Sequence, residues 1–229
     1  MKRLLRQIWG VFKKDLLLDL RSGGRLTAVA FFAGMTLLLF SFAAPPDGIS
    51  LGLNAAGYLW LALLLASVLA LGESFRIEVE DEALEGLRLL PVDPMALYYG
   101  KALATTTLLI GLCVLVLPAA LVLYGVAIKG AVWKMIATLI LGCAGLAAPG
   151  TLYSAMTSRA RGQDVLLPLL LFPLVIPVLV SAVKATSLLL HGDINPGGSA
   201  SSSHLSLLLC FDVVYWSVCG LLFGKVIDE

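Results

Sequence analysis

Charged residues are scarce in this chain of 229 residues: they make up 14% of it, whereas 59% of the residues are hydrophobic and the mean hydropathy is +0.97. Soluble domains carry about 25% charged residues, so the composition excludes an ordinary soluble domain. A helix that crosses a membrane needs about 20 consecutive apolar residues. We expect six such spans, at residues 26–43, 51–72, 102–124, 131–156, 165–190 and 205–227.

Motifs for enzymatic chemistry are missing as well. No GxxxxGK[ST] sequence occurs, so the chain cannot hold ATP in a phosphate-binding loop of that type. HExxH and a pair of aspartates within the spans are also absent. We therefore expect a non-catalytic chain that binds no metal or cofactor of its own. The only histidines, His191 and His204, flank a Gly/Ser-rich stretch, and we interpret them as plain polar residues.

Only four cysteines occur, and each falls inside an expected span: Cys113, Cys143, Cys210 and Cys219. None of them forms a CxxC pair, so neither a zinc site nor a disulfide framework is indicated. Unpaired cysteine behaves as a small hydrophobe and is often buried. We expect all four to pack between helices.

Basic residues are unevenly placed, and their distribution predicts how the chain is oriented. With the amino terminus inside, seven Lys and Arg precede the first span, three lie between the second and third, two between the fourth and fifth, and one near the end. The opposite side has only Lys129, Lys134 and Lys184. The positive-inside rule therefore places both termini in the cytoplasm. The net charge is only +1 and no basic patch forms, so we expect no nucleic-acid partner.

The residues before the first span, 1–25, combine apolar and basic positions. The apolar ones recur at helical spacing: Leu5, Ile8, Trp9, Phe12 and Leu16. This pattern is typical of an amphipathic helix that lies in the headgroup plane. A basic signal that only sets the topology explains the same residues, and the two interpretations are compatible.

Acidic residues gather in one place, because residues 73–101 contain seven of the 15 in the chain. Leucines recur on one stripe of residues 80–90 while the acids occupy other faces, which predicts a short amphipathic helix. Pro91 cannot continue that helix. Asp93 and Pro94 then predict the N-cap and first turn of the next one. The short helix is either a rigid element that transmits a push from a cytoplasmic partner or a solvated acidic loop.

Two charges fall inside the last two spans. Lys184 and Asp212 each lie about 10 Å from the outer end of their span, at 1.5 Å per residue. In one interpretation they form an ion pair between neighbouring helices, because charges in lipid find partners. In the other, residues 183–211 form a re-entrant or interfacial element and both charges contact water.

Proline and small residues predict the shapes of two spans. Pro168, Pro173 and Pro177 remove backbone donors from the fifth span and are expected to bend it. Glycine and alanine are frequent at 142–150 in the fourth span, which favours a close approach to a neighbouring helix. Packing within one subunit is the default interpretation, and a homodimer interface is the alternative.

Two stretches carry a resemblance to a known family. Residues 75–103, "FRIEVEDEALEGLRLLPVDPMALYYGKAL", resemble the second cytoplasmic segment of ABC-2 type membrane subunits of ABC transporters, and more closely that of the CcmB family of the cytochrome c maturation system. Residues 148–180, "APGTLYSAMTSRARGQDVLLPLLLFPLVIPVLV", are similar to the APG, Arg-loop and proline series of the same family. Gln163 and Asp164 depart from the small or apolar residues expected there.

The resemblance implies an all-α, polytopic membrane protein of six helices of the ABC-2 exporter type, in the bacterial inner membrane. It implies a permease-like subunit, present in two copies, that works with the ATPase CcmA, the membrane subunits CcmC and CcmD and the periplasmic haem chaperone CcmE. ATP would be hydrolysed in the partner, and haem would be the cargo of the complex.

By the same resemblance, the short cytoplasmic helix is the element that couples to the ATPase. Its residues are Glu80, Glu82, Leu84, Glu85, Leu87, Arg88, Leu90 and Pro91. The alternatives are an ABC-2 permease for another cargo, such as a drug or polysaccharide, and a scaffold that transports nothing.

Overall fold

The structure is a computed structural model, and it describes residues 2–21, 23–44, 49–80, 93–158, 163–192 and 199–228. Every regular element within these ranges is a helix, so the all-α prediction is confirmed. The helices are α1 (Lys2–Arg21), α2 (Gly23–Ala43), α3 (Ile49–Glu80), α5 (Pro94–Leu123), α6 (Val132–Thr157), α7 (Gln163–His191) and α8 (Ser199–Asp228).

Helices α2 to α8 supply six stretches long and apolar enough to cross a membrane, as the sequence predicts. The third and sixth begin earlier than expected, at Pro94 and Ser199 rather than at residues 102 and 205. Polar and charged side chains at a helix end do not interrupt the helix; they only place that end near the membrane surface. Hydropathy therefore located the apolar cores of these spans and missed their first turns.

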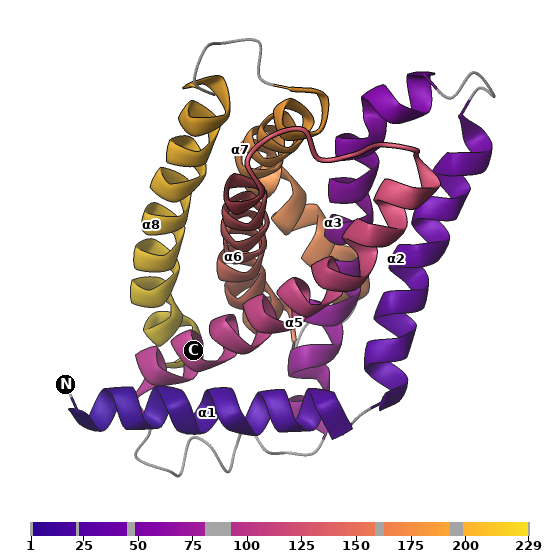
Figure 1. Cartoon of the computed structure of the whole chain (residues 1–229). Coiled ribbons are helices and arrows are strands. Elements are labelled where there is room, and N and C mark those ends of the chain that lie inside the picture. The colour runs from indigo at the N-terminus through magenta and orange to yellow at the C-terminus, as the bar shows by residue number, and fades with distance from the viewer. Residues whose placement is uncertain are drawn as a thin grey trace.

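Helix α1 lies across one end of the bundle and crosses the direction of α2 and α8 (Figure 1). We call this the α1 end and the opposite one the far end. The carboxyl-terminal part of α8 also lies at the α1 end, so both termini are on the same side of the bundle (Figure 1). This arrangement follows from an even number of spans.

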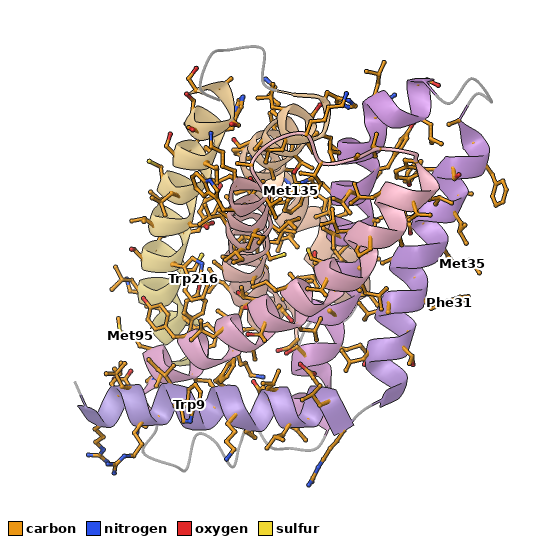
Figure 2. All side chains as sticks on the ribbon, in the orientation of Figure 1. Trp9, Phe31, Met35, Met95, Met135 and Trp216 are labelled. Carbon is orange, nitrogen blue, oxygen red and sulfur yellow. The ribbon has the colours of Figure 1, made fainter. Side chains whose placement is uncertain are left out.

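Helix α6 is the centre of the bundle and packs against α3, α5, α7 and α8. In the apolar 18-residue stretch of α6, 67% of the residues are buried, whereas only 22% are buried in those of α2 and α8 at the two edges. Figure 2 shows the contrast in single side chains: Met135 of α6 points into the bundle, while Phe31 and Met35 of α2 point outward. The outward faces are the ones that lipid can cover.

Small residues let α6 approach its neighbours, and this prediction is confirmed for packing within one chain. A Cβ added at Gly142 would overlap the ring of Trp60 on α3, and one at Gly150 would overlap the side chain of Leu71. Trp60 is fully buried by this contact, and its Nε1 donates a hydrogen bond of 2.9 Å to Thr186 Oγ1 on α7. The α3–α6–α7 core therefore depends on glycine at 142.

The cysteines follow the prediction in three cases of four. Cys113 and Cys143 are buried between α5 and α6 with their Sγ atoms 3.4 Å apart, and Cys219 is buried as well. The expectation is wrong for Cys210, which is exposed. Its helix, α8, is an edge helix, so much of the surface of α8 faces outward.

Candidate functional site

The candidate site is the start of α5, residues 93–101, which we call the junction segment. Asp93 caps the helix by accepting a 3.0 Å hydrogen bond from the Met95 backbone N–H, and Pro94 occupies the first turn. This cap confirms the sequence prediction. The junction segment directly follows residues 81–92, so a force applied to those residues acts directly on the start of α5.

The predicted coupling helix lies almost wholly outside the described residues. Glu80 ends α3, which runs as one helix from Ile49 instead of stopping near residue 72. The other predicted coupling residues are not described: Glu82, Leu84, Glu85, Leu87, Arg88, Leu90 and Pro91. Their role stays a prediction, and what the structure describes is the pair of helices on either side, α3 and α5.

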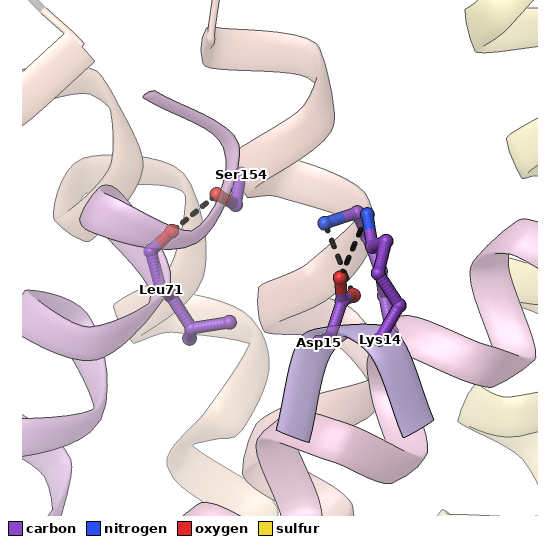
Figure 3. A network of polar contacts seen from close by, with 5 residues as sticks. Lys14, Asp15, Leu71 and Ser154 are labelled. Carbon is purple, nitrogen blue, oxygen red and sulfur yellow. Dashed lines mark hydrogen bonds and ion pairs between the residues drawn. The ribbon is translucent and has the colours of Figure 1, made fainter. Parts of the chain in front are cut away.

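The last two residues of the junction segment, Gly100 and Lys101, contact α1. A Cβ added at Gly100 would lie 2.6 Å from Val11 Cβ, so only glycine allows α1 this close. The next residue, Lys101, is 2% exposed, and its Nζ lies 3.3 Å from Asp15 Oδ2 of α1. Asp15 also pairs with Lys14 at 2.9 Å, as Figure 3 shows. Helix α1 is thus docked on the protein through an acidic face, in addition to any contact with lipid.

Two tyrosines of the junction segment reach α6 and α8. The Tyr98 hydroxyl donates a 3.2 Å hydrogen bond to the Ala148 carbonyl of α6, and the Tyr99 hydroxyl donates one of 3.3 Å to the Trp216 carbonyl of α8. Tyr98 is fully buried and its ring lies 5.3 Å from that of Phe223. A displacement of α5 at the junction segment would therefore change its contacts with three other helices, α1, α6 and α8.

Helix α3 is tied to the same part of α6. Ser154 Oγ donates a hydrogen bond to the Leu71 carbonyl, a contact drawn in Figure 3, and Gly150 admits the Leu71 side chain. Residues 148–154 of α6 thus contact both helices that bracket residues 81–92. They also belong to the second of the two stretches that carry the family resemblance, so the two stretches meet in space.

Lys101 and Asp15 form the charged contact of this site that sequence reasoning missed. Lys101 counted there as a loop charge because the apolar run begins after it. The structure places it inside α5 and buries it. A buried charge needs a partner, and that requirement, applied to Lys101, would have directed attention to the two acids of the leader.

The structure does not form the predicted ion pair between Lys184 and Asp212. Asp212 is 6% exposed and packs against Gly145 of α6, and neither of its carboxylate oxygens has a hydrogen-bond partner among the described residues. Lys184 is exposed. The two side chains do not meet because Asp212 is buried against α6, whereas Lys184 is exposed on the surface of α7. Helix α7 continues to His191 and α8 begins at Ser199, so the described part of 183–211 is helical, and the re-entrant alternative stays a prediction.

The remaining predicted residues lie as follows. Pro168, Pro173 and Pro177 are all inside α7, which is continuous across the described residues, and the bend they would cause stays a prediction. His191 ends α7 and His204 lies near the start of α8. In the described ranges no three His, Cys, Asp or Glu residues come together as a metal site would require.

The six spans, the docked α1 and the junction segment define the class of protein: a polytopic helical membrane protein in which α1 lies across one end of the bundle and packs against α5. A family model described as "CcmB protein" matches residues 6–227. The chain therefore belongs to the CcmB protein family.

Three relatives with the name "Heme exporter protein B" are similar to most of this chain. "Heme exporter protein B" of Rhodobacter capsulatus is 35% identical over 174 residues, which is 74% of this chain and 78% of the relative. That of Paracoccus denitrificans is 34% identical over 75% of this chain and 78% of its own length. That of Bradyrhizobium diazoefficiens is 30% identical over 83% and 86%. The similarity thus extends over most of both chains.

Proposed function

We propose that this chain is the non-catalytic membrane subunit of a haem exporter complex and that it couples ATP hydrolysis in a separate ATPase subunit to a change in its helix packing. The relatives named "Heme exporter protein B" support the haem part of this proposal. The observation that carries the coupling part is the junction segment, which begins one residue after 81–92 and contacts α1, α6 and α8.

The coupling route has three steps. The ATPase, of the CcmA type, binds the helix predicted at residues 80–91, with leucines supplying most of the affinity and acids aiding the encounter. Its movement displaces the end of α3 and the start of α5 together, because both contact residues 148–154 of α6. The packing of α6 against α8 then changes through Tyr99 and Trp216.

The setting of the complex follows the family resemblance. We place two copies of the chain in the bacterial inner membrane with CcmC and CcmD, and the haem chaperone CcmE on the periplasmic side. The amino terminus, α1 and the carboxyl terminus face the cytoplasm, because thirteen of the sixteen Lys and Arg residues then lie on that side. ATP binds in the partner, and haem is the cargo of the complex.

The test compares ATPase capture and c-type cytochrome production in the same cells. Leu84→Asp/Leu87→Asp should release the ATPase from the tagged, detergent-purified subunit and abolish c-type cytochromes. The matched control, Ala127→Asp/Lys129→Asp, adds two acids at exposed positions of the far end and should do neither.

The outcomes separate the parts of the proposal. If the ATPase stays bound to Leu84→Asp/Leu87→Asp, residues 80–91 are not the docking element. If it leaves while cytochromes form normally, the haem assignment is wrong and a permease for another cargo replaces it. If neither variant changes the rate of ATP hydrolysis by the complex, the scaffold interpretation is correct.

A further inference from the structure

The far half of the bundle contains a groove between α3 and α7 that the proposed function does not use. Its volume is about 420 Å³. The lining is mostly apolar, with Leu53, Gly57 and Leu61 on α3 and Leu179 and Val183 on α7. Leu53 and Leu61 are 60% and 38% exposed, so the groove is open along α3. It lies inside the two membrane spans, where the surrounding solvent is lipid.

Two short polar side chains, Asn54 and Ser187, line the far part of this groove, and the amphipathic rings of Tyr58 and Trp60 line it deeper along α3. Lys184 precedes Ser187 by three residues and therefore lies beside it on the surface of α7. Lys184 is exposed and makes no ion pair or hydrogen bond with any other described residue. An unpaired lysine inside a span is costly unless it reaches a headgroup or binds an anion.

Lys184 and Asn54 lie at similar depths in the membrane spans. Lys184 precedes the end of α7 by seven residues and Asn54 follows the start of α3 by five, which is about 10 Å and about 7 Å along the helices. Both side chains are thus at the level where acyl chains meet headgroups, and Gly57 and Leu61 continue the groove deeper along α3. A cation above an apolar groove matches an amphiphile with an anionic head.

Two other grooves in the bundle lack this combination. The one between α2 and α5, about 620 Å³, has no polar side chain in its lining. The one between α1, α2 and α5, about 390 Å³, is lined by Asp19 and by no basic residue. Charge complementarity therefore singles out the α3–α7 groove.

We propose that the α3–α7 groove binds a phospholipid with an anionic headgroup from the leaflet at the far end. Its phosphate faces Lys184, with Asn54 and Ser187 as neutral polar neighbours, and one acyl chain lies along Gly57 and Leu61. The inference is independent of the haem assignment, because it concerns residues that the coupling route leaves out.

The test uses Trp60, which lines this groove, as the reporter. Trp9, Trp133 and Trp216 are replaced by Phe, and the protein is reconstituted in phosphatidylcholine vesicles. Dibrominated phosphatidylglycerol or dibrominated phosphatidylcholine is then added in steps, because bromine quenches a nearby indole. We expect an apparent affinity about five-fold higher for the anionic lipid, the effect of one lysine near anionic lipid.

Two pairs of variants test the two parts of the site. Lys184→Gln should reduce the preference for phosphatidylglycerol to about one-fold, while Lys184→Arg and the far-end control Lys129→Gln retain it. Gly57→Leu should weaken quenching by both lipids, because a Cβ there meets nothing within 4 Å and the larger side chain extends into the open groove. The control Gly34→Leu makes the same change in the α2–α5 groove, also in open space, and should leave the quenching unchanged.

The proposal is overturned by equal quenching from the two lipids, by a preference that survives Lys184→Gln, or by quenching that survives Gly57→Leu. Fluorescence of Trp60 that neither brominated lipid quenches also overturns it, because no acyl chain would then lie in the groove. A size-exclusion profile identical to that of the parent confirms that each variant is folded.

Discussion

The contact between α1 and α5 depends on glycine at position 100, and Gly100→Ala tests it directly. The added Cβ would lie 2.6 Å from Val11 Cβ, 2.7 Å from Val11 Cγ1 and 3.1 Å from the Ile8 carbonyl oxygen. Overpacking of this kind costs about 1–3 kcal/mol. Against it stands the higher helix propensity of alanine, about 1 kcal/mol. Gly111→Ala, in the same helix, gains the propensity without the clash, since nothing lies within 4 Å of its Cβ.

The difference between the two variants isolates the cost of the clash. A chain of this size changes its Tm by about 2–4 °C per kcal/mol, so a difference of about 2 kcal/mol places Gly100→Ala about 4–8 °C below Gly111→Ala. The assay is thermal unfolding of the detergent-purified protein, followed by fluorescence-detected size exclusion. Val11→Gly removes both clashing carbon atoms. The double variant Val11→Gly/Gly100→Ala should therefore be more stable than the sum of the two single changes in stability predicts. Equal midpoints for Gly100→Ala and Gly111→Ala would refute close docking of α1.

Three further predictions concern buried polar contacts. A double-mutant cycle of Asp15→Asn and Lys101→Met should give a coupling energy of about 0.5–3 kcal/mol in thermal unfolding, and a coupling of zero would mean that the pair does not hold α1. Asp212→Asn should stabilise the protein or leave its Tm unchanged, because the carboxylate has no hydrogen-bond partner among the described residues to lose. Lys184→Gln should not alter the Tm. An equal decrease in Tm for both variants would show that the two residues do form an ion pair. Trp60→Phe should cost about 1–3 kcal/mol through the lost hydrogen bond to α7 and the hydroxyl left unpaired, and a Tm equal to that of the wild type would show that this bond contributes nothing.

Structural features that depend on a few neighbouring residues could be predicted from the sequence. The cap at Asp93 was predicted because an aspartate before Pro94 has one obvious use at a helix start. The six spans were predicted because a lipid environment requires long apolar helices and little else. Glycines at 142 and 150 indicated close packing, although the sequence could not say that Trp60 and Leu71 would fill the space.

Contacts between residues far apart in the sequence could not be predicted in this way. Lys184 and Asp212 lie at matching depths, so the sequence allowed an ion pair as one of two interpretations, yet only Asp212 is buried in the bundle. Cys210 and Cys219 lie in the same helix and received the same prediction, and the rotation of α8 exposed one and buried the other. Depth can be counted along a helix, whereas the direction of a side chain depends on how neighbouring helices pack.

The sequence by itself determined that this chain is a six-span helical membrane protein, where its spans lie and which family it resembles, because those properties depend on composition, periodicity and local motifs. Only the tertiary structure decided that Lys101 meets Asp15, that Tyr98 reaches the carbonyl of Ala148 and that the two family stretches come together beside α1. Such contacts join residues about 50 or more positions apart. They arise only when the helices pack, since each partner is then taken from water or lipid and must be satisfied by the other.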